Sequence, residues 1–247
     1  MKNNFFFKNQ LSNIYKSPSR YSEVISQIIY GEKFKILSKN TNWIKIKTSF
    51  DNYVGYIRNK NYVSNYNSTH KVCVLKTSIY GTQRIKKNFL PFGSKVSIIS
   101  ENKNFAEFEK NRWIKKKDLK KIHHKELNYL KIFNFFLKTK YLWGGKTYKG
   151  IDCSAILQLF FYYNNRFYPR DTKDQIRYSK KNIKRKIFKK GDIIFWKGHV
   201  AICINSKKLI HAYGPKKKVV VMYIKKTISR IENTAKLSIK KISSLNH

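Results

Sequence analysis

Cys153 and two histidines are the residues of this chain whose types and spacing could support covalent chemistry. Cys153 follows an aromatic loop with three glycines and precedes the apolar run 156–163, which predicts a buried helix. The thiol is therefore expected at a helix N-terminus, where unpaired backbone N–H groups favour negative charge and lower a thiol pKa. The competing interpretation is a buried structural cysteine, as lone cysteines often are.

His199 and His211 are the candidate partners of this thiol. A thiol nucleophile needs a base, and the base needs a group that orients it. One imidazole would take the thiol proton and return it to the leaving amine, and the other would fix the tautomer of the first. A zinc site is the alternative, but tetrahedral sites need closer ligand pairs. We therefore expect no metal and no cofactor.

Short strands must position the two histidines. Three apolar runs with Gly or Asn spacers predict an antiparallel meander that places the histidines on neighbouring strands. Cys203 falls on the same strand face as His199 and is expected to be a small strand residue, and Cys73 is interpreted in the same way. The predicted elements of this half are helices over 125–138, from 153 and from Asp171 or Thr172 to about Lys180, and strands over 193–196, 199–204, 208–213 and 219–224.

The N-terminal half contains an internal repeat of β-prone runs. Segment 31–37 resembles 93–99, and Asn42-Trp43 resembles Asn104-Phe105, both with an offset of 62 residues. Each copy has a turn glycine, an aromatic in the next strand and a closing aromatic-isoleucine strand, which resembles bacterial SH3-like barrels. Most of four aromatics are expected in the barrel cores: Trp43, Tyr56, Phe105 and Trp113.

The charge of the chain is extreme. Its 247 residues carry 54 Lys and Arg against 13 Asp and Glu, a net charge of +41. Such a field attracts anions of any kind. However, the basic residues are spread along a chain rich in Asn, Ile, Phe and Tyr, so biased coding is the favoured explanation and a nucleic-acid partner is not expected.

Three widely spaced cysteines give no disulfide framework. The N-terminus lacks the apolar run of a secretory signal, and no run is long enough to span a membrane. We expect a soluble cytoplasmic protein.

Six motifs in the C-terminal half resemble the NlpC/P60 family of papain-like cysteine peptidases. Ala155 departs from the family pattern, which has Gly there, but a methyl group costs little in a helix. The motifs are Tyr-Leu-Trp-Gly-Gly (141–145), Gly-Ile-Asp-Cys-Ser (150–154), Pro-Arg-Asp-Thr with Gln175 (169–175), Gly-Asp-Ile (191–193), Gly-His-Val-Ala-Ile (198–202) and Ile-His-Ala (210–212).

This resemblance implies an α+β fold, with a papain-like NlpC-type catalytic domain preceded by two small all-β SH3-like barrels. The implied domains are 1–66, 67–122 and 123–247. The implied roles are nucleophile for Cys153, general base for His199, orienting residue for His211, and substrate binding for Tyr141, Asp152 and Ser154.

The implied activity is hydrolysis of peptidoglycan (murein) peptides. The expected bond is the one between γ-D-Glu and a diamino acid, in fragments with a free N-terminal L-Ala. Two alternatives stay open: a basic SH3-like protein that binds cell wall or nucleic acid and carries a vestigial peptidase, and a thiol amidase or acyltransferase acting on another substrate.

Overall fold

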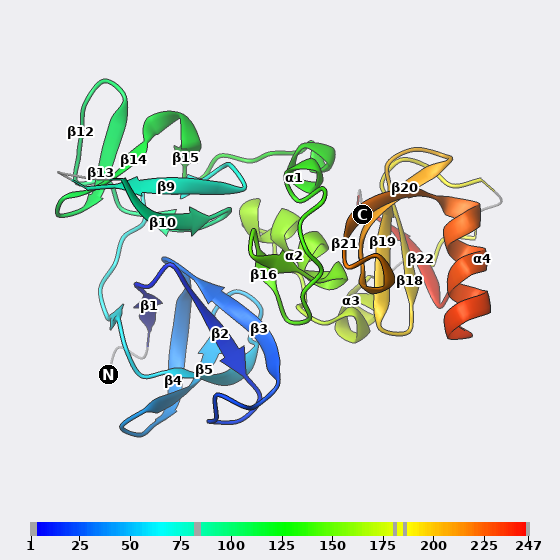
Figure 1. The fold of residues 1–247 in the computed structure, drawn as a ribbon, viewed down its shortest axis with the longest axis horizontal. Helices are drawn as coiled ribbons and strands as arrows, with labels where there is room; N and C mark the ends of the chain where they lie inside the picture. Colours follow the sequence, from blue (N-terminus) through cyan, green and yellow to red (C-terminus); the bar gives the residue numbers. More distant parts are fainter. Residues whose placement is uncertain (1–3, 82–84, 180–181, 185–186, 246–247) are drawn as a thin grey trace. The chain divides into compact units, whose positions relative to one another are not determined.

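The structure, a computed structural model, describes residues 4–81, 85–179, 182–184 and 187–245. The chain forms two compact units (Figure 1). Unit 1 contains the residues up to Glu126 together with Tyr162–Asn165, and unit 2 contains Leu127–Phe161 and the residues from Arg166 onward. Within the described ranges, no helix is long and apolar enough to cross a membrane.

The first repeat of unit 1 is one antiparallel sheet of seven strands in the order β3-β2-β6-β5-β4-β1-β7. Alternate residues of these strands bury a core that includes Phe7, Phe34 and Ile46. The strands are β1 (Phe5–Phe7), β2 (Leu11–Tyr15), β3 (Val24–Ile29), β4 (Lys33–Lys39), β5 (Trp43–Thr48), β6 (Val54–Arg58) and β7 (Tyr62–Val63).

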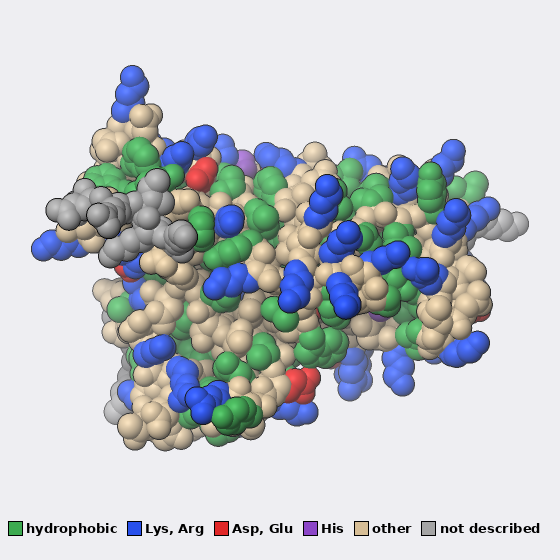
Figure 2. Space-filling view, viewed as in Figure 1, with side chains coloured by type: hydrophobic (Ala, Val, Ile, Leu, Met, Phe, Trp, Pro, Cys, Tyr) green, Lys and Arg blue, Asp and Glu red, His purple; other side chains and the backbone are tan. Residues whose placement is uncertain are grey.

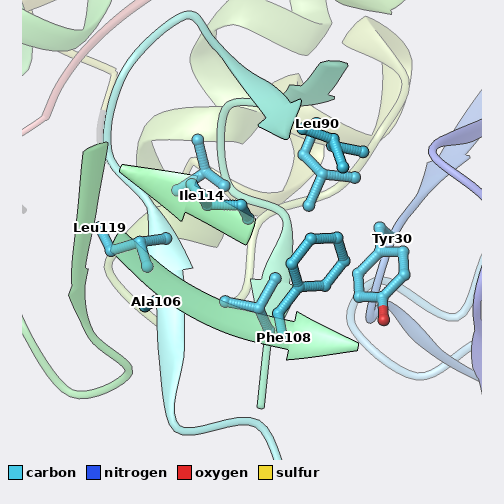
Figure 3. Packing of buried hydrophobic residues seen from close by; sticks show 9 residues of the cluster. Tyr30, Leu90, Ala106, Phe108, Ile114 and Leu119 are labelled. Carbon is cyan, nitrogen blue, oxygen red and sulfur yellow. The ribbon is translucent and has the colours of Figure 1, made fainter. Parts of the chain in front are cut away.

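The second repeat is built from two small antiparallel sheets, β10-β9-β14-β13-β12 and β11-β8-β15. Its core gathers Leu90, Phe108 and Ile114, and Tyr30 of the first repeat packs edge-on against Phe108 with 5.5 Å between ring centroids (Figure 3). The elements are β8 (His70–Val72), β9 (Lys76–Tyr80), β10 (Ile85–Pro91), β11 (Lys95–Val96), β12 (Ser100–Glu101), β13 (Phe105–Glu109), β14 (Arg112–Lys115), η1 (Lys116–Asp118) and β15 (Leu119–Lys121).

The two copies share hydrogen bonds at the same offset of 62 residues. Asn40 Oδ1 accepts from the amide of Trp43 at 2.8 Å, and Asn102 Oδ1 accepts from the amide of Phe105 at 2.9 Å. The turn glycines match as well, with φ of 77° at Gly31 and 79° at Gly93. The internal repeat is therefore present in the backbone as well as in the sequence.

The prediction that most of the four repeat aromatics are core residues is wrong. Trp43 is 8% exposed, whereas the other three are half-buried. Because side chains alternate between the faces of a strand, the residue after each half-buried aromatic points inward instead. The half-buried aromatics are Tyr56, Phe105 and Trp113, and their inward neighbours are Ile57, Ala106 and Ile114.

Unit 2 combines helices with a five-stranded antiparallel sheet in the order β21-β20-β19-β18-β22. The predicted meander is confirmed as β18 to β21. The predicted helix 125–138 is shorter, because α1 begins at Tyr129 and ends at Phe135. The elements are α1 (Tyr129–Phe135), β16 (Lys146–Thr147), β17 (Gly150–Ile151), α2 (Cys153–Tyr163), α3 (Thr172–Tyr178), β18 (Asp192–Trp196), β19 (His199–Cys203), β20 (Lys208–Tyr213), η2 (Gly214–Lys216), β21 (Lys218–Tyr223), α4 (Ile224–Ala235) and β22 (Lys241–Ser244).

One face of this sheet packs against α4, which the sequence analysis did not anticipate. Ile224 and Ile231 of the helix join Ala201, Cys203 and other sheet residues in a core cluster. Cys203 is fully buried there, as expected for a small strand residue. The α+β architecture expected from the sequence is confirmed.

Basic side chains are spread over the face of the molecule that Figure 2 shows. On the face seen in Figure 2, Lys and Arg are scattered over both units and do not gather over one element, and acidic side chains are few. This distribution agrees with a diffuse field and gives no single basic groove on that face.

Candidate active site

The loop before Cys153 is compact because its glycines allow close backbone approaches. Gly144 has φ of 71°. A Cβ on Gly145 would lie 2.5 Å from the carbonyl oxygen of Gly150, so no larger residue fits. The amide of Asp152 donates to the carbonyl of Gly145 at 3.2 Å, which fixes the approach of the chain to α2.

Asp152 is the N-cap of α2. Its Oδ1 accepts from the amide of Ala155 at 2.8 Å, and its backbone carbonyl accepts from the amide of Ile156. Its Oδ2 accepts from the amide of Gly144 at 3.1 Å. One carboxylate therefore ties the glycine loop to the first turn of the helix and sets the position of Cys153.

Arg170 neutralises this buried carboxylate. Its Nη2 lies 2.6 Å from Asp152 Oδ2 and its Nη1 lies 3.0 Å from Oδ1, in a bidentate pair, while Nη1 also donates to Ser154 Oγ at 2.9 Å. The three side chains are 3–6% exposed. The sequence analysis noted Arg170 but did not place it in the site. The sequence feature that could have identified it as a site residue is its position in the Pro-Arg-Asp-Thr motif.

Cys153 opens α2 as predicted, and its thiol lies beside the turn that begins β19. Sγ is 3.9 Å from the carbonyl oxygen of Gly198, and the backbone of Val200 also contacts the sulfur. These residues flank His199 in the sequence, so the thiol faces the start of the strand that carries the candidate base.

The expected lowering of the thiol pKa is not found. Burial, followed by the nearby Asp152 carboxylate, raises the pKa of Cys153 to about 11. The Val200 backbone, the side chain of Thr172 and Arg170 act in the opposite direction but are outweighed. A helix N-terminus favours a thiolate only by a modest amount, whereas removal from water penalises it strongly.

His199 and His211 form a direct ring-to-ring pair. Strands β19 and β20 are neighbours in the sheet, and His199 Nε2 lies 2.9 Å from His211 Nδ1. Tyr213 stacks on His211 with 4.6 Å between ring centroids, and Trp196 packs against His199. The bond to His211 occupies Nε2 of His199 and leaves Nδ1 as its second ring nitrogen.

Both imidazoles are held neutral. Burial lowers the pKa of His199 to about 4. Burial and the neighbouring His199 lower the pKa of His211 well below its usual value. Near neutral pH the resting pair is therefore a thiol and a neutral imidazole, and not a thiolate–imidazolium ion pair.

Tyr141 is half-buried beside the same site. Its amide donates to the carbonyl of Lys217 at 2.9 Å, and its backbone bridges to Ile151. Burial, then the charges of Cys153 and Asp152, raise the pKa of its phenol, so the hydroxyl stays protonated and available as a donor.

The six residues singled out from the sequence all belong to unit 2. Four lie at the start of α2 or in the segment before it, namely Tyr141, Asp152, Cys153 and Ser154, whereas His199 begins β19 and His211 lies on the neighbouring strand β20. The structure adds Arg170, Thr172 and Met222, whose sulfur lies 3.3 Å from His211 Nε2. Nothing in the sequence pattern marked Met222. Among the described residues there is no group of three or more His, Cys, Asp or Glu able to hold a metal ion.

A buried cysteine at a helix start and two hydrogen-bonded histidines on an antiparallel sheet are the arrangement expected of a papain-like cysteine peptidase. Comparisons with known proteins agree. Residues 138–236 match the NlpC/P60 family, and residues 14–61 match the bacterial dipeptidyl-peptidase Sh3 domain. Residues 138–236 are therefore an NlpC/P60 domain, and residues 14–61 are a bacterial SH3 domain N-terminal to it. The chain is a cysteine peptidase of the peptidoglycan-hydrolysing kind.

Individual relatives cover most of the chain. It is 22% identical over 234 residues to "Dipeptidyl-peptidase 6" of Lysinibacillus sphaericus, spanning 82% of this chain and 84% of that protein. It is also 22% identical over 228 residues to "Gamma-D-glutamyl-L-lysine dipeptidyl-peptidase" of Bacillus subtilis, spanning 82% and 77%. An NlpC/P60 family protein from Bacillus cereus has the same fold, with a TM-score of 0.82 at 16% identity over 97% and 98% of the two chains.

Proposed function

We propose that the chain hydrolyses the bond between γ-D-Glu and a diamino acid in murein peptides with a free N-terminal L-Ala. The observation that carries the proposal is the site itself: Cys153 opens α2 with its sulfur 3.9 Å from the carbonyl oxygen of Gly198, the residue before His199, and a neutral His199 is bonded to His211. The choice of bond is supported by the likeness to the Bacillus subtilis enzyme over 82% of this chain.

Acylation begins with a neutral pair. The Cys153 thiol passes its proton to Nδ1 of His199 as the sulfur attacks the carbonyl carbon of the γ-glutamyl amide. The carbonyl π electrons move to oxygen, and the backbone N–H of Cys153 would donate to this oxyanion. The C–N bond then breaks, and His199 returns the proton to the leaving amine.

Deacylation repeats this chemistry with water. His199 takes a proton from a water molecule, the hydroxide attacks the thioester, and the C–S bond breaks. The proton on His199 returns to the Cys153 sulfur, so a free γ-carboxylic acid and the resting thiol remain. In both halves the bond to His211 holds the ring of His199, and Nδ1, the nitrogen not used in that bond, is assigned to proton exchange with the sulfur.

The proposed substrate-binding residues differ in their capacity to make further hydrogen bonds to a substrate. The Tyr141 phenol is a protonated donor beside Cys153 and Asp152. Asp152 already accepts five hydrogen bonds, from Gly144, Ser154, Ala155 and twice from Arg170. A substrate ammonium at Asp152 has to share oxygens that hold the site together, and this part of the proposal stays a prediction.

Mass spectrometry of the products tests the proposal. The substrates are L-Ala-γ-D-Glu-L-Lys and its N-acetylated form, with Cys153→Ala as the control. We expect release of Lys from the free peptide only, and none with Cys153→Ala. Release from the acetylated peptide would overturn the free-amine requirement, and turnover by Cys153→Ala would overturn the nucleophile.

The same experiment separates the alternatives. Transfer of the acyl group to an added amine in place of water would identify an acyltransferase. A vestigial site would give no product and no reaction of Cys153 with iodoacetamide. The predicted cytoplasmic location stays a prediction.

A further inference from the structure

His211 is bonded at both ring nitrogens although it is fully buried. Its Nδ1 lies 2.9 Å from His199 Nε2, and its Nε2 lies 3.3 Å from the sulfur of Met222. Met222 lies on β21, where it pairs with Leu209, while Val220 pairs with His211. Met222 is thus the diagonal cross-strand neighbour of His211 on the same face of the sheet.

The direction of the bond between the histidines decides whether His199 can act as a base. If His199 Nε2 carries the proton and donates to His211, Nδ1 of His199 is left with a lone pair that can accept the thiol proton. If His211 Nδ1 donates instead, neutral His199 must carry its proton on Nδ1 and presents a donor to the sulfur. Only the first arrangement supports catalysis.

The sulfur of Met222 selects the first arrangement. A thioether is an acceptor without a proton of its own. It accepts a bond when His211 carries its proton on Nε2, and it opposes that nitrogen with its own lone pairs when the proton is on Nδ1. Because the ring of His211 is fully buried, bulk water does not compensate for the lost bond.

We propose that Met222 is a positioning residue that fixes the tautomer of His211 and, through it, that of His199. Its sulfur lies at the end of a hydrogen-bonded chain that runs from His199 through His211 to Met222. The effect on turnover rests on the proposed function, whereas the tautomer of His211 can be measured independently of it.

The role of the Met222 sulfur can be tested selectively, because Met1 and Met222 are the two methionines of the chain. Production with norleucine in place of methionine exchanges the Met222 sulfur for a methylene group of similar size and leaves every other internal residue unchanged. Met222→Leu is the second variant. Because it is made by mutation, it shows whether the result depends on the incorporation of norleucine.

Two measurements are compared between the methionine and norleucine proteins. Nitrogen-15 NMR of the imidazoles, assigned with His199→Asn and His211→Asn, reports which nitrogen of each ring carries a proton. We expect Nε2–H on His211 in the methionine protein and a mixture of tautomers in the norleucine protein. We also expect kcat to fall roughly 3- to 10-fold with KM unchanged, as the loss of a weak hydrogen bond predicts.

Some outcomes would overturn the proposal. One is Nδ1–H on His211 in the methionine protein, and the other is an unchanged tautomer and kcat in both the norleucine protein and Met222→Leu. A protein with the expected tautomers and no activity on murein peptides would contradict the proposed function and still support the assignment that Met222 fixes the tautomer of His211.

Discussion

The reactive residues of this site are uncharged at rest, and their environment explains why. Cys153 is 4% exposed and has a pKa of about 11, while His199 has a pKa of about 4. Both shifts have burial as their largest cause, which disfavours the charged form of each group. In the proposed mechanism the thiolate therefore forms when substrate is in place, with His199 as general base.

The uncharged resting state of Cys153 and His199 predicts how the rate of reaction between the Cys153 thiol and iodoacetamide depends on pH. In a Cys73→Ser background, inactivation through Cys153 should accelerate about tenfold per pH unit between pH 7 and 9, because the thiolate fraction rises tenfold per unit below the pKa. Cys203, which is fully buried, should stay unmodified. A rate plateau between pH 5 and 8 would show a preformed ion pair and contradict the prediction.

At the scale of elements, one buried ion pair connects the start of α2 to the segment before α3. Arg170 binds Asp152 through two bonds in a region closed to water. The same carboxylate caps α2 and holds the glycine loop. Loss of the arginine would leave a buried charge without its partner, which is far more costly than loss of an exposed pair.

Arg170→Met should therefore lower the free energy of unfolding by about 3–5 kcal/mol. Arg177→Met is the matched control, because Arg177 makes an exposed pair with Asp174 at 3.6 Å, and its loss should cost less than about 1 kcal/mol. Thermal and urea unfolding of the two variants measures the difference. Equal effects would mean that the buried pair contributes no more than a surface pair.

The two turn glycines of the repeats are equivalent in conformation but not in surroundings. A Cβ on Gly31 would lie 2.0 Å from the backbone oxygen of Lys95, whereas a Cβ on Gly93 would lie 3.1 Å from a ring atom of Tyr162. Both residues have positive φ, so both alanine variants carry the strain of the left-handed region.

Gly31→Ala should be the more destabilising change. The backbone strain costs about 1–3 kcal/mol in either variant, and the contact with Lys95 adds to it because a backbone atom cannot rotate away. Thermal unfolding of Gly31→Ala and Gly93→Ala compares them directly. A larger loss in Gly93→Ala would contradict the close approach at Gly31.

At the scale of the whole molecule, the residues behind the net charge of +41 are distributed along the entire sequence, and they do not gather over one element on the face seen in Figure 2. A diffuse positive field raises the local concentration of any anionic peptide and is screened by salt over about 10 Å at 0.1 M. Steering should therefore act through KM and depend little on single side chains.

The value of kcat/KM for a murein peptide should fall by roughly 3- to 10-fold as salt is raised from about 20 to 500 mM, since screening weakens steering. The same peptide with amidated carboxylates is the control and should show a smaller decrease. Single changes such as Lys35→Gln should alter the dependence little. A variant of one lysine that abolishes the salt effect would show a focused site instead.

The sequence by itself determined the local features. The apolar run after Cys153 gave the helix, the runs around His199 and His211 gave neighbouring strands, and the 62-residue offset gave two related β repeats. These features depend on periodicity and turn residues, which act over a few positions along the chain. The family motifs, in their order, indicated the class of peptidase.

Only the tertiary structure decided what surrounds the reactive atoms. It placed Arg170 on Asp152 and Met222 on His211, and it buried the thiol so that its pKa rose where the helix terminus alone predicted a decrease. Desolvation and partner identity depend on which distant segments pack together, and a pattern within one segment carries no information about them.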